Sequence, residues 1–408
     1  MSFSYRKEVV MHEIQKYYLD VIIITSKFIT KTVIMKRGLY VHIPFCVQRC
    51  RYCDFYSEIY SPGHAKEYIN VLCKEVGRLE CDYQSIYIGG GTPSVLDVRS
   101  LERLLSALER KRWPIDEFTV EVNPESLNED KLKLFKDYGV DRISIGVQSF
   151  IDKKLKKLGR LHSAEKAKNK VREVFSRGFK NISGDLIFGL EGETLKEWRK
   201  DLKEALILPF SHLSTYMLTY EKGTLLHKEL RRGSIKPLSE DKVASMYREV
   251  SAILKGAGML HYEISNFCLP GFPCVHNVNY WNNGLYTGLG PSAVSYDGQT
   301  RLRNIDGSQR YIAKFFEGEL PVSSIERLTK RKKARETAAL KVRMAEGIDF
   351  EWFKDSTGFD FISLEGRAVD EMAGLKLVKY IKKDGRLRGV KLTARGFFYS
   401  DTVSAAFL

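Results

Sequence analysis

The stretch that decides the fold runs from Tyr40 to Cys53 and reads YVHIPFCVQRCRYC. It begins with apolar and β-branched residues typical of a strand, and it ends in a short loop carrying Cys46, Cys50 and Cys53. Three thiolates on one loop can bind three corners of a cubane cluster and leave one iron open to an outside ligand. The sequence therefore predicts a [4Fe-4S] cluster here. Zinc is the alternative, but it usually takes four protein ligands from paired C-x-x-C motifs.

From residue 38 onward, short apolar strands alternate with amphipathic helices, as in βα units around a parallel sheet. The predicted strands are Leu39–Phe45, Ser85–Ile88, Phe118–Val122, Arg142–Val147, Ile182–Phe188 and Leu213–Leu218. The clearest helices are Ala65–Leu79, Val98–Glu109, Asn128–Tyr138, Ala164–Ser176 and Leu195–Leu206. We therefore expect an α/β fold whose core is an incomplete (β/α)6 TIM-like barrel.

Polar and glycine-rich segments follow the predicted strands, which is where barrels of this kind carry their chemistry. The cysteine loop follows the first strand, and a GGGTP segment at 89–93 follows the second. Glu121 lies at the end of the third strand, Gln148 ends the fourth, and Asp185 lies within the fifth. We expect these groups to meet at one rim of the barrel.

The chain divides into four predicted parts. Residues 1–37 are an N-terminal extension, either an overlong start assignment or a loosely docked arm, and 38–235 form the barrel. Residues 236–319 form an irregular linking segment, and 320–408 form an α+β winged-helix-like domain. Its predicted elements are helices at Ile325–Met344 and Leu364–Leu375, a hairpin of Leu377–Lys382 with Leu387–Leu392, and a closing helix at Ala394–Ala405.

Composition indicates a globular protein with a large core. The chain has 408 residues, of which 43% are hydrophobic and 12% aromatic, and its formal net charge is +15. This charge raises the question of a polyanionic partner. The basic residues are spread along the chain, however, without aromatic platforms or a charge-massed recognition helix. We therefore expect no nucleic-acid partner.

Cysteine usage and hydropathy bear on the compartment. The seven cysteines are an odd number, and no secretory signal precedes them, so we expect reduced thiols in a cytoplasmic protein. The longest N-terminal apolar run, 21–24, is soon followed by Lys27 and Lys31 and is far shorter than the ~20 residues that span a bilayer. We expect no transmembrane segment. Transient contact with a membrane protein is compatible with this expectation.

The motif from Tyr40 to Cys53 resembles the entry motif of the HemN/HemW branch of radical S-adenosylmethionine (SAM) proteins, and the likeness continues to the C-terminus. It implies that the amino and carboxylate groups of SAM chelate the open iron. An electron from the cluster, which a cellular donor reduces, can then cleave the sulfonium to methionine and a 5′-deoxyadenosyl radical. The resemblance implies SAM contacts at Tyr40, Gly90, Gly91, Thr92, Glu121, Gln148, Arg160 and Asp185.

Two features separate the branches. HemN-type coproporphyrinogen dehydrogenases carry a fourth cysteine where this chain has Phe55, whereas the HemW branch has an aromatic residue there. Downstream, His276-Asn-x-x-Tyr280-Trp281 resembles the H-N-x-x-Y-W motif associated with the HemW branch and its heme binding. An imidazole is a good axial ligand for heme iron, so His276 is the candidate heme ligand, with Cys274 as a second candidate. Alternatively, His276 and its aromatic neighbours pack this segment onto the barrel.

One loop departs from the family pattern. The usual G-L-P-G-Q-T after the fifth strand is GLEGET here, with Glu191 and Glu193 in place of proline and glutamine. Val294 also replaces a histidine that is common after the G-x-G-P segment. These changes leave the contacts of the GLEGET loop open.

The resemblance implies a heme chaperone of the HemW type, which binds heme and passes it to an acceptor protein. The first alternative is oxygen-independent decarboxylation of coproporphyrinogen III, against which Phe55 argues. A related radical SAM methyltransferase or heme-opening enzyme would need the same three cysteines, but no positive feature of this sequence supports it.

Overall fold

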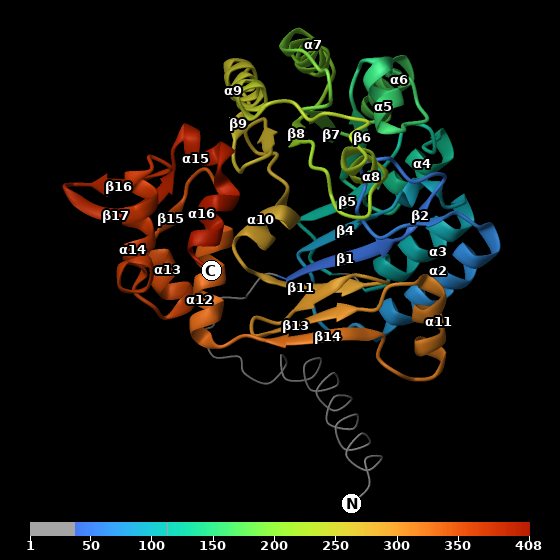
Figure 1. Ribbon diagram of the computed structural model, residues 1–408. Coiled ribbons are helices and arrows are strands. Elements are labelled where there is room, and N and C mark those ends of the chain that lie inside the picture. Colours follow the sequence, from blue (N-terminus) through green and yellow to red (C-terminus); the bar gives the residue numbers. More distant parts are fainter. Residues whose placement is uncertain (1–36, 112) are drawn as a thin grey trace, which may run out of the picture.

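The computed structural model describes residues 37–111 and 113–408, and its barrel has the predicted order of strands (Figure 1). The barrel strands run parallel. They are β1 (Arg37–Ile43), β4 (Ser85–Gly90), β5 (Glu117–Val122), β6 (Arg142–Gln148), β7 (Asn181–Phe188) and β8 (His212–Met217). Two short strands, β2 (Phe45–Cys46) and β3 (Glu58–Ile59), flank the cysteine loop. The predicted α/β barrel is confirmed.

Helices cover the outer face of the barrel. They are α2 (Pro62–Arg78), α3 (Val98–Glu109), α4 (Glu129–Asp137), α5 (Asp152–Leu158), α6 (Ala164–Ser176) and α7 (Leu195–Leu206), with a 3-10 turn η2 (Pro93–Val95). Side-chain caps explain several starts. Asp97 accepts from the amide of Ser100 to begin α3, and Thr194 with Glu197 forms a capping box on α7. Two further helices follow β8: α8 (Leu225–Arg231) and α9 (Glu240–Gly256).

The barrel strands alternate apolar and polar residues. On β5, Phe118, Val120 and Val122 are buried in the main hydrophobic core, whereas Thr119 and Glu121 lie on the opposite face. Residues in register on neighbouring parallel strands share a face. The face of Thr119 and Glu121 therefore carries Tyr40, Tyr87, Ser144, Asp185 and Ser214. The apolar core thus lies between sheet and helices, and the barrel interior is polar, unlike the packed aliphatic interior of a closed TIM barrel.

The segment predicted as irregular, 236–319, contributes strands to both edges of the barrel sheet. Next to β8 lie β10 (Asn266–Cys268) and β9 (Leu260–His261). Next to β1 lie β11 (Leu285–Leu289), β12 (Val294–Tyr296) and β13 (Thr300–Asn304), and β14 (Val322–Arg327), from just beyond this segment, completes that edge. Between these groups lies α10 (Val275–Trp281), and α11 (Ser308–Phe316) packs against α2. The result is a twelve-stranded sheet, so this segment is part of the barrel domain.

The C-terminal unit, drawn in orange to red at one side of the barrel, has its own hydrophobic core (Figure 1). Its elements are α12 (Lys330–Lys341), β15 (Ile348–Asp349), α13 (Phe350–Thr357), α14 (Phe361–Gly374), β16 (Val378–Lys383), β17 (Arg386–Leu392), α15 (Ala394–Phe398) and α16 (Ser400–Ala406). The helix predicted to start at Ile325 starts at Lys330, because 322–327 pair with β13. Residue 320 therefore lies before the last strand of the barrel sheet, and the winged-helix-like description stays a prediction.

The N-terminal extension and a possible membrane-spanning helix remain to be considered. The extension predicted over 1–37 lies outside the described residues, apart from Arg37, which begins β1. Within the described residues, no helix is both long and apolar enough to cross a membrane.

Candidate functional site

A cavity of about 490 Å³ opens at the carboxyl ends of the barrel strands. It brings together most residues that the sequence singled out. They are Cys46, Cys50, Cys53, Gly90, Gly91, Thr92, Glu121, Gln148, Arg160 and Asp185. The prediction that the polar strand ends meet at one rim is confirmed. Phe55 also lines the mouth of this cavity, with 67% of its surface exposed.

The cysteine loop is anchored to the barrel through Arg51. The Arg51 amide donates to the carbonyl of Leu158 at 3.1 Å, and its guanidinium donates to the carbonyl of Lys157 and pairs with Glu229 on α8. Within the loop, the amide of Cys53 donates to the carbonyl of Cys50 at 3.3 Å. These contacts fix the loop on the side away from the cavity. The three thiols line the cavity, are half-buried and form no disulfide.

Two of the three thiols are in contact with polar side chains of the cavity wall. The Cys46 sulfur lies 3.5 Å from Thr92 Oγ1, and Arg160 Nη1 donates to the Cys50 sulfur at 3.5 Å. Burial raises the pKa of Cys46, and it raises that of Cys53 to about 11. Burial thus favours the neutral thiols, and a bound metal cluster would favour the thiolates. Over the described residues, no three His, Cys, Asp or Glu side chains converge as they would around a single metal ion.

The glycine loop packs directly against the cysteine loop. The Gly91 amide donates to the carbonyl of Ile43 at 2.8 Å, and a Cβ on Gly91 would lie 2.8 Å from the carbonyl oxygen of Phe45. Gly90 has a φ of 112°, and a Cβ there would overlap the His42 ring. Both positions therefore require glycine, which exposes backbone to the cavity.

Two carboxyl groups face the cavity from inside the barrel. Glu121 accepts from Tyr87 Oη at 2.7 Å and from the amide of Gly90 at 3.0 Å. Burial raises the pKa of Glu121, while these two hydrogen bonds oppose the rise. Burial, followed by the charge of Glu121, raises the pKa of Asp185 to about 6. The cavity therefore offers two carboxylates suited to a cationic or hydroxyl-bearing ligand.

Arg160 crosses the cavity wall between two loops. Its Nη2 donates to Asn123 Oδ1 at 2.5 Å and to the carbonyl of Gly146 at 2.8 Å. Its Nε is buried without a partner among the described residues. Asn123 also donates to Thr92 Oγ1 at 2.9 Å, so it connects the arginine to the glycine loop. We did not select Asn123 from the sequence, although its place at the end of the third strand was the available signal.

Gln148 sits on a backbone irregularity at the same rim. Its φ is 65°, and the register between β6 and β7 shifts between Ile145 and Gln148. A non-glycine residue in the left-handed region is uncommon, and such strain is often kept at functional sites. Gln148 thus lines the cavity from the point where the pairing of β6 with β7 is irregular.

Tyr40 is the one predicted SAM contact that does not line the cavity. Its hydroxyl is hydrogen-bonded to His42 Nδ1 at 3.0 Å, and His42 Nε2 lies 3.0 Å from the carbonyl oxygen of Tyr56. Both ring nitrogens of His42 are thus used locally, within the first βα unit. Tyr40 lies beside Tyr87 inside the barrel, with ring centroids 6.2 Å apart.

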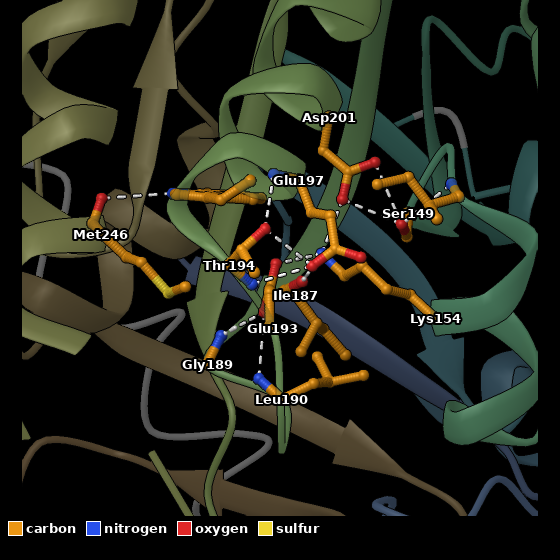
Figure 2. Close-up of polar contacts among 12 residues, drawn as sticks. Ser149, Lys154, Ile187, Gly189, Leu190, Glu193, Thr194, Glu197, Asp201 and Met246 are labelled. Carbon is orange, nitrogen blue, oxygen red and sulfur yellow. Dashed lines mark hydrogen bonds and ion pairs between the residues drawn. The ribbon is translucent and has the colours of Figure 1, made fainter. Parts of the chain in front are cut away.

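The GLEGET loop is organised by a buried charge cluster (Figure 2). Lys154 Nζ lies 2.5 Å from Glu193 and 2.6 Å from Asp201, all three side chains being buried. Glu193 Oε2 accepts from the amides of Gly189 and Leu190. The carboxylate that replaces the family's glutamine therefore fixes the loop and balances Lys154.

The same cluster braces two strand ends at the cavity. Asp201 accepts from Ser149 Oγ and from the amide of Phe150, just after β6. Lys154 donates to the carbonyl of Ile187 on β7 at 3.3 Å, and Ile187 lines the cavity. Asp201 and Lys154 thus connect the ends of β6 and β7, the strands that carry Gln148 and Asp185, on the side away from the cavity.

His276 lies at the opposite end of the barrel, where the strands begin. Its Nδ1 lies 2.9 Å from Ser85 Oγ, its Nε2 lies 3.0 Å from Tyr280 Oη, and only 1% of its surface is exposed. Burial lowers its pKa to about 3, so the imidazole is neutral. The structure does not bring His276 to the cavity, and iron ligation would require one of these hydrogen bonds to break.

Helix α10 closes this lower end of the barrel. Glu117, at the start of β5, accepts from the amides of Val275 at 2.9 Å and His276 at 3.2 Å, and from the thiol of Cys274 at 3.4 Å. Arg142 lies 4.0 Å from Glu117, and both are buried. One carboxylate thus caps α10 and compensates a buried guanidinium.

An open parallel barrel with three thiols beside a glycine loop at its carboxyl rim is the architecture of a radical SAM protein. A family model described as Radical SAM superfamily matches residues 40–205. The solved structure of coproporphyrinogen III oxidase (HemN) from Escherichia coli superimposes with a TM-score of 0.78 and 22% identity, covering 91% of this chain and 90% of that chain. This similarity supports the fold over nearly the whole length.

Sequence comparison narrows the class further. The protein named heme chaperone HemW in Lactococcus lactis subsp. lactis (strain IL1403) is 37% identical over 372 residues, 90% of this chain and 96% of the relative. That of Bacillus subtilis (strain 168) is 33% identical over 380 residues, 91% of this chain and 99% of the relative. The chain belongs to the HemW family of radical SAM proteins.

Membership of this superfamily implies a [4Fe-4S] cluster and SAM, and the cavity has features that fit both. Its three thiols are half-buried and free of disulfides, as cluster ligands must be. The side-chain-free Gly90 and Gly91 and the unpartnered Nε of Arg160 leave room and a donor for a small zwitterion. Asn123, which was not among the predicted site residues, also lines this cavity, and Tyr87 supports it as the hydrogen-bond donor to Glu121.

Proposed function

We propose that the chain is a heme chaperone that holds a [4Fe-4S] cluster and SAM, binds heme and transfers it to an acceptor protein. The observation that carries this proposal is similarity over most of the chain to proteins named heme chaperone HemW, with 37% identity over 90% of this chain in the Lactococcus relative. A cellular electron donor and transient contact with a membrane protein as acceptor complete the proposed partners, and the proposed compartment is the cytoplasm.

We assign the cofactors to the cavity at the carboxyl ends of the barrel strands. Cys46, Cys50 and Cys53 are the proposed ligands of three irons, and the open iron with its reduced cluster supplies electron transfer to bound SAM. The proposed SAM contacts are Tyr40, Gly90, Gly91, Thr92, Glu121, Gln148, Arg160 and Asp185. In this arrangement the glycine backbone approaches SAM, Glu121 and Asp185 face its cationic and hydroxyl groups, and Arg160 holds the Cys50 side of the cavity.

Heme is the proposed cargo, and His276 is its proposed axial ligand. Because both ring nitrogens are hydrogen-bonded within the barrel, ligation requires either the bond to Ser85 Oγ or the bond to Tyr280 Oη to break. Titration of the cluster-reconstituted protein with hemin tests both statements. We expect a saturable Soret change that His276→Ala weakens and that His227→Ala on α8 leaves unchanged. A wild-type titration without saturation would refute heme binding, and an unaltered His276→Ala spectrum would refute ligation by this residue.

Heme transfer is tested separately from heme binding. Heme-loaded protein is mixed with a heme-free globin, and the Soret band of the globin is followed with time. We expect transfer to the globin, faster than release of heme into buffer alone. A parallel anaerobic assay with coproporphyrinogen III, SAM and dithionite should yield no protoporphyrinogen, since Phe55 stands where HemN-type enzymes carry a cysteine. Product formation would instead favour the dehydrogenase.

A further inference from the structure

Three side chains form a continuous column along the barrel interior, from the cavity to the lower end. Tyr87 Oη donates to Glu121 Oε1 at 2.7 Å. The Tyr87 ring rests on the His276 ring, with centroids 5.2 Å apart and planes tilted by 32°. The H-N-x-x-Y-W motif is thereby in contact with the residue that holds a carboxylate of the cavity.

Two glycines leave the space that this column fills. A Cβ on Gly89 would lie 2.8 Å from both Glu121 Cδ and Tyr87 Cε1. A Cβ on Gly38 would lie 2.9 Å from His276 Cε1. Both distances are too short for real contacts. Glycine at two separate strands therefore serves the same column.

The His276 ring is fixed in place from both sides. Ser85 Oγ on β4 and Tyr280 Oη on α10 each bond one ring nitrogen, at 2.9 and 3.0 Å. Glu117 in turn fixes the start of α10 through the amides of Val275 and His276. The His276 ring is thus a fixed surface against which the Tyr87 ring packs.

We infer that His276 is a positioning residue of the SAM pocket, which acts by holding Tyr87 under Glu121. The inference rests on the proposed assignment of Glu121 as a SAM contact. A carboxylate with one oxygen bound by Tyr87 and the other by the Gly90 amide has a fixed orientation. Without the ring below it, Tyr87 gains rotameric freedom, and ordering it again weakens SAM binding.

The test measures SAM affinity by equilibrium dialysis with labelled SAM, in anaerobically reconstituted protein. We expect Tyr87→Phe and His276→Ala each to raise the Kd of SAM about tenfold, as loss of one hydrogen bond to a charged group does. The double variant should bind SAM no more weakly than Tyr87→Phe alone, because both act on one column. Tyr380→Phe is the matched control, since Tyr380 Oη donates to Asp370 at the same 2.7 Å in the C-terminal unit.

Iron content and urea unfolding separate positioning from damage to the fold. If His276→Ala does not fold, Tyr280→Phe removes only the hydroxyl at Nε2, and we expect it to raise the Kd of SAM about twofold to threefold. An unchanged SAM Kd in the folded variants, or additive effects in the double variant, would overturn the inference. Hemin titration of the same samples reports on the proposed function independently, because its failure leaves the SAM result intact.

Discussion

The two ends of the barrel are built from the same strands, but one end is open and the other is closed. At the upper end, where the strands end, Glu121, Asp185 and Arg160 line an open cavity of about 490 Å³. At the lower end, α10 covers the interior, and Glu117 accepts three hydrogen bonds from it. The upper end is arranged to receive a ligand, whereas at the lower end the chain itself occupies the corresponding place.

This difference shows that the type of a residue does not by itself determine its role, because its surroundings decide which of its atoms can bind a ligand. The H-N-x-x-Y-W motif suggests a heme ligand at His276, yet both nitrogens of its ring are hydrogen-bonded within the protein. The cysteines, by contrast, point into a cavity in a state that costs free energy to ionise, because burial raises the pKa of Cys53 to about 11. If the two ends are separate in function, a substitution at one end should leave the properties of the other end unchanged.

The largest expected effect is at the upper end. Cys50→Ser should abolish cluster assembly, lowering iron from about four atoms per chain to near zero, because a cubane with one open iron needs all three protein thiolates. Iron and sulfide analysis after anaerobic reconstitution measures this. Cys73→Ser on the outer helix α2 is the control and should retain its iron. Full iron content in Cys50→Ser would contradict the ligand assignment.

The cluster behind the upper rim should be the most sensitive point for stability. Lys154→Met leaves Glu193 and Asp201 buried without their cation, and we expect the free energy of unfolding to fall by about 3–5 kcal/mol. Urea unfolding measures the loss. Lys168→Met, which breaks a partly exposed pair with Glu204, should cost less than about 1 kcal/mol. Equal losses in the two variants would show that the buried cluster has no special weight.

The lower end gives a prediction that separates it from the cofactor site. Glu117→Gln weakens the cap of α10 and leaves Arg142 without its buried counter-ion, which should cost about 2–3 kcal/mol. Iron content after reconstitution should stay at the wild-type level. Glu249→Gln, at an exposed pair with Arg199, is the control for stability. Loss of iron in Glu117→Gln would mean that the two ends are coupled in cluster assembly.

The smallest effect concerns the pH dependence of stability at the cavity. Because the folded pKa of Asp185 is raised to about 6, the unfolded chain loses its proton first, and stability falls as pH rises toward 6. Asp185→Asn removes this loss. It should raise the free energy of unfolding by about 1 kcal/mol more at pH 8 than at pH 5. Urea titrations at both pH values check this, and a pH-independent difference would argue against the raised pKa.

The barrel could be predicted from the sequence because its strands carry their own signal. Apolar residues such as Phe118, Val120 and Val122 recur between helices with clear caps. The strands at the two sheet edges could not be predicted in this way. They are two to six residues long, and β11 pairs with β1 across about 250 residues of chain, so that tertiary contacts rather than local pattern define them.

The upper site was predictable because each of its groups follows a strand, and a barrel collects such positions at one rim. The column below it was not predicted. Tyr87 lies in mid-strand as an ordinary β-former, and only the alternation of Tyr87 with Ile86 and Ile88 shows that it points inward. The role of Glu193 was also hidden, because its partner Lys154 is distant in sequence and becomes its neighbour only in the fold.

The segment between β9 and β14 holds both edges of the barrel sheet, and this shapes how the protein can be made. A nascent chain that ends at residue 259 contains the six barrel strands, β1 and β4 to β8, but β1 still lacks its outer neighbour β11 and β8 still lacks its outer neighbour β10. Bare strand edges invite pairing with other chains. The ribosome must therefore deliver 68 further residues, 260–327, before the barrel is sealed, and premature truncation in this window should yield aggregates rather than a smaller working barrel.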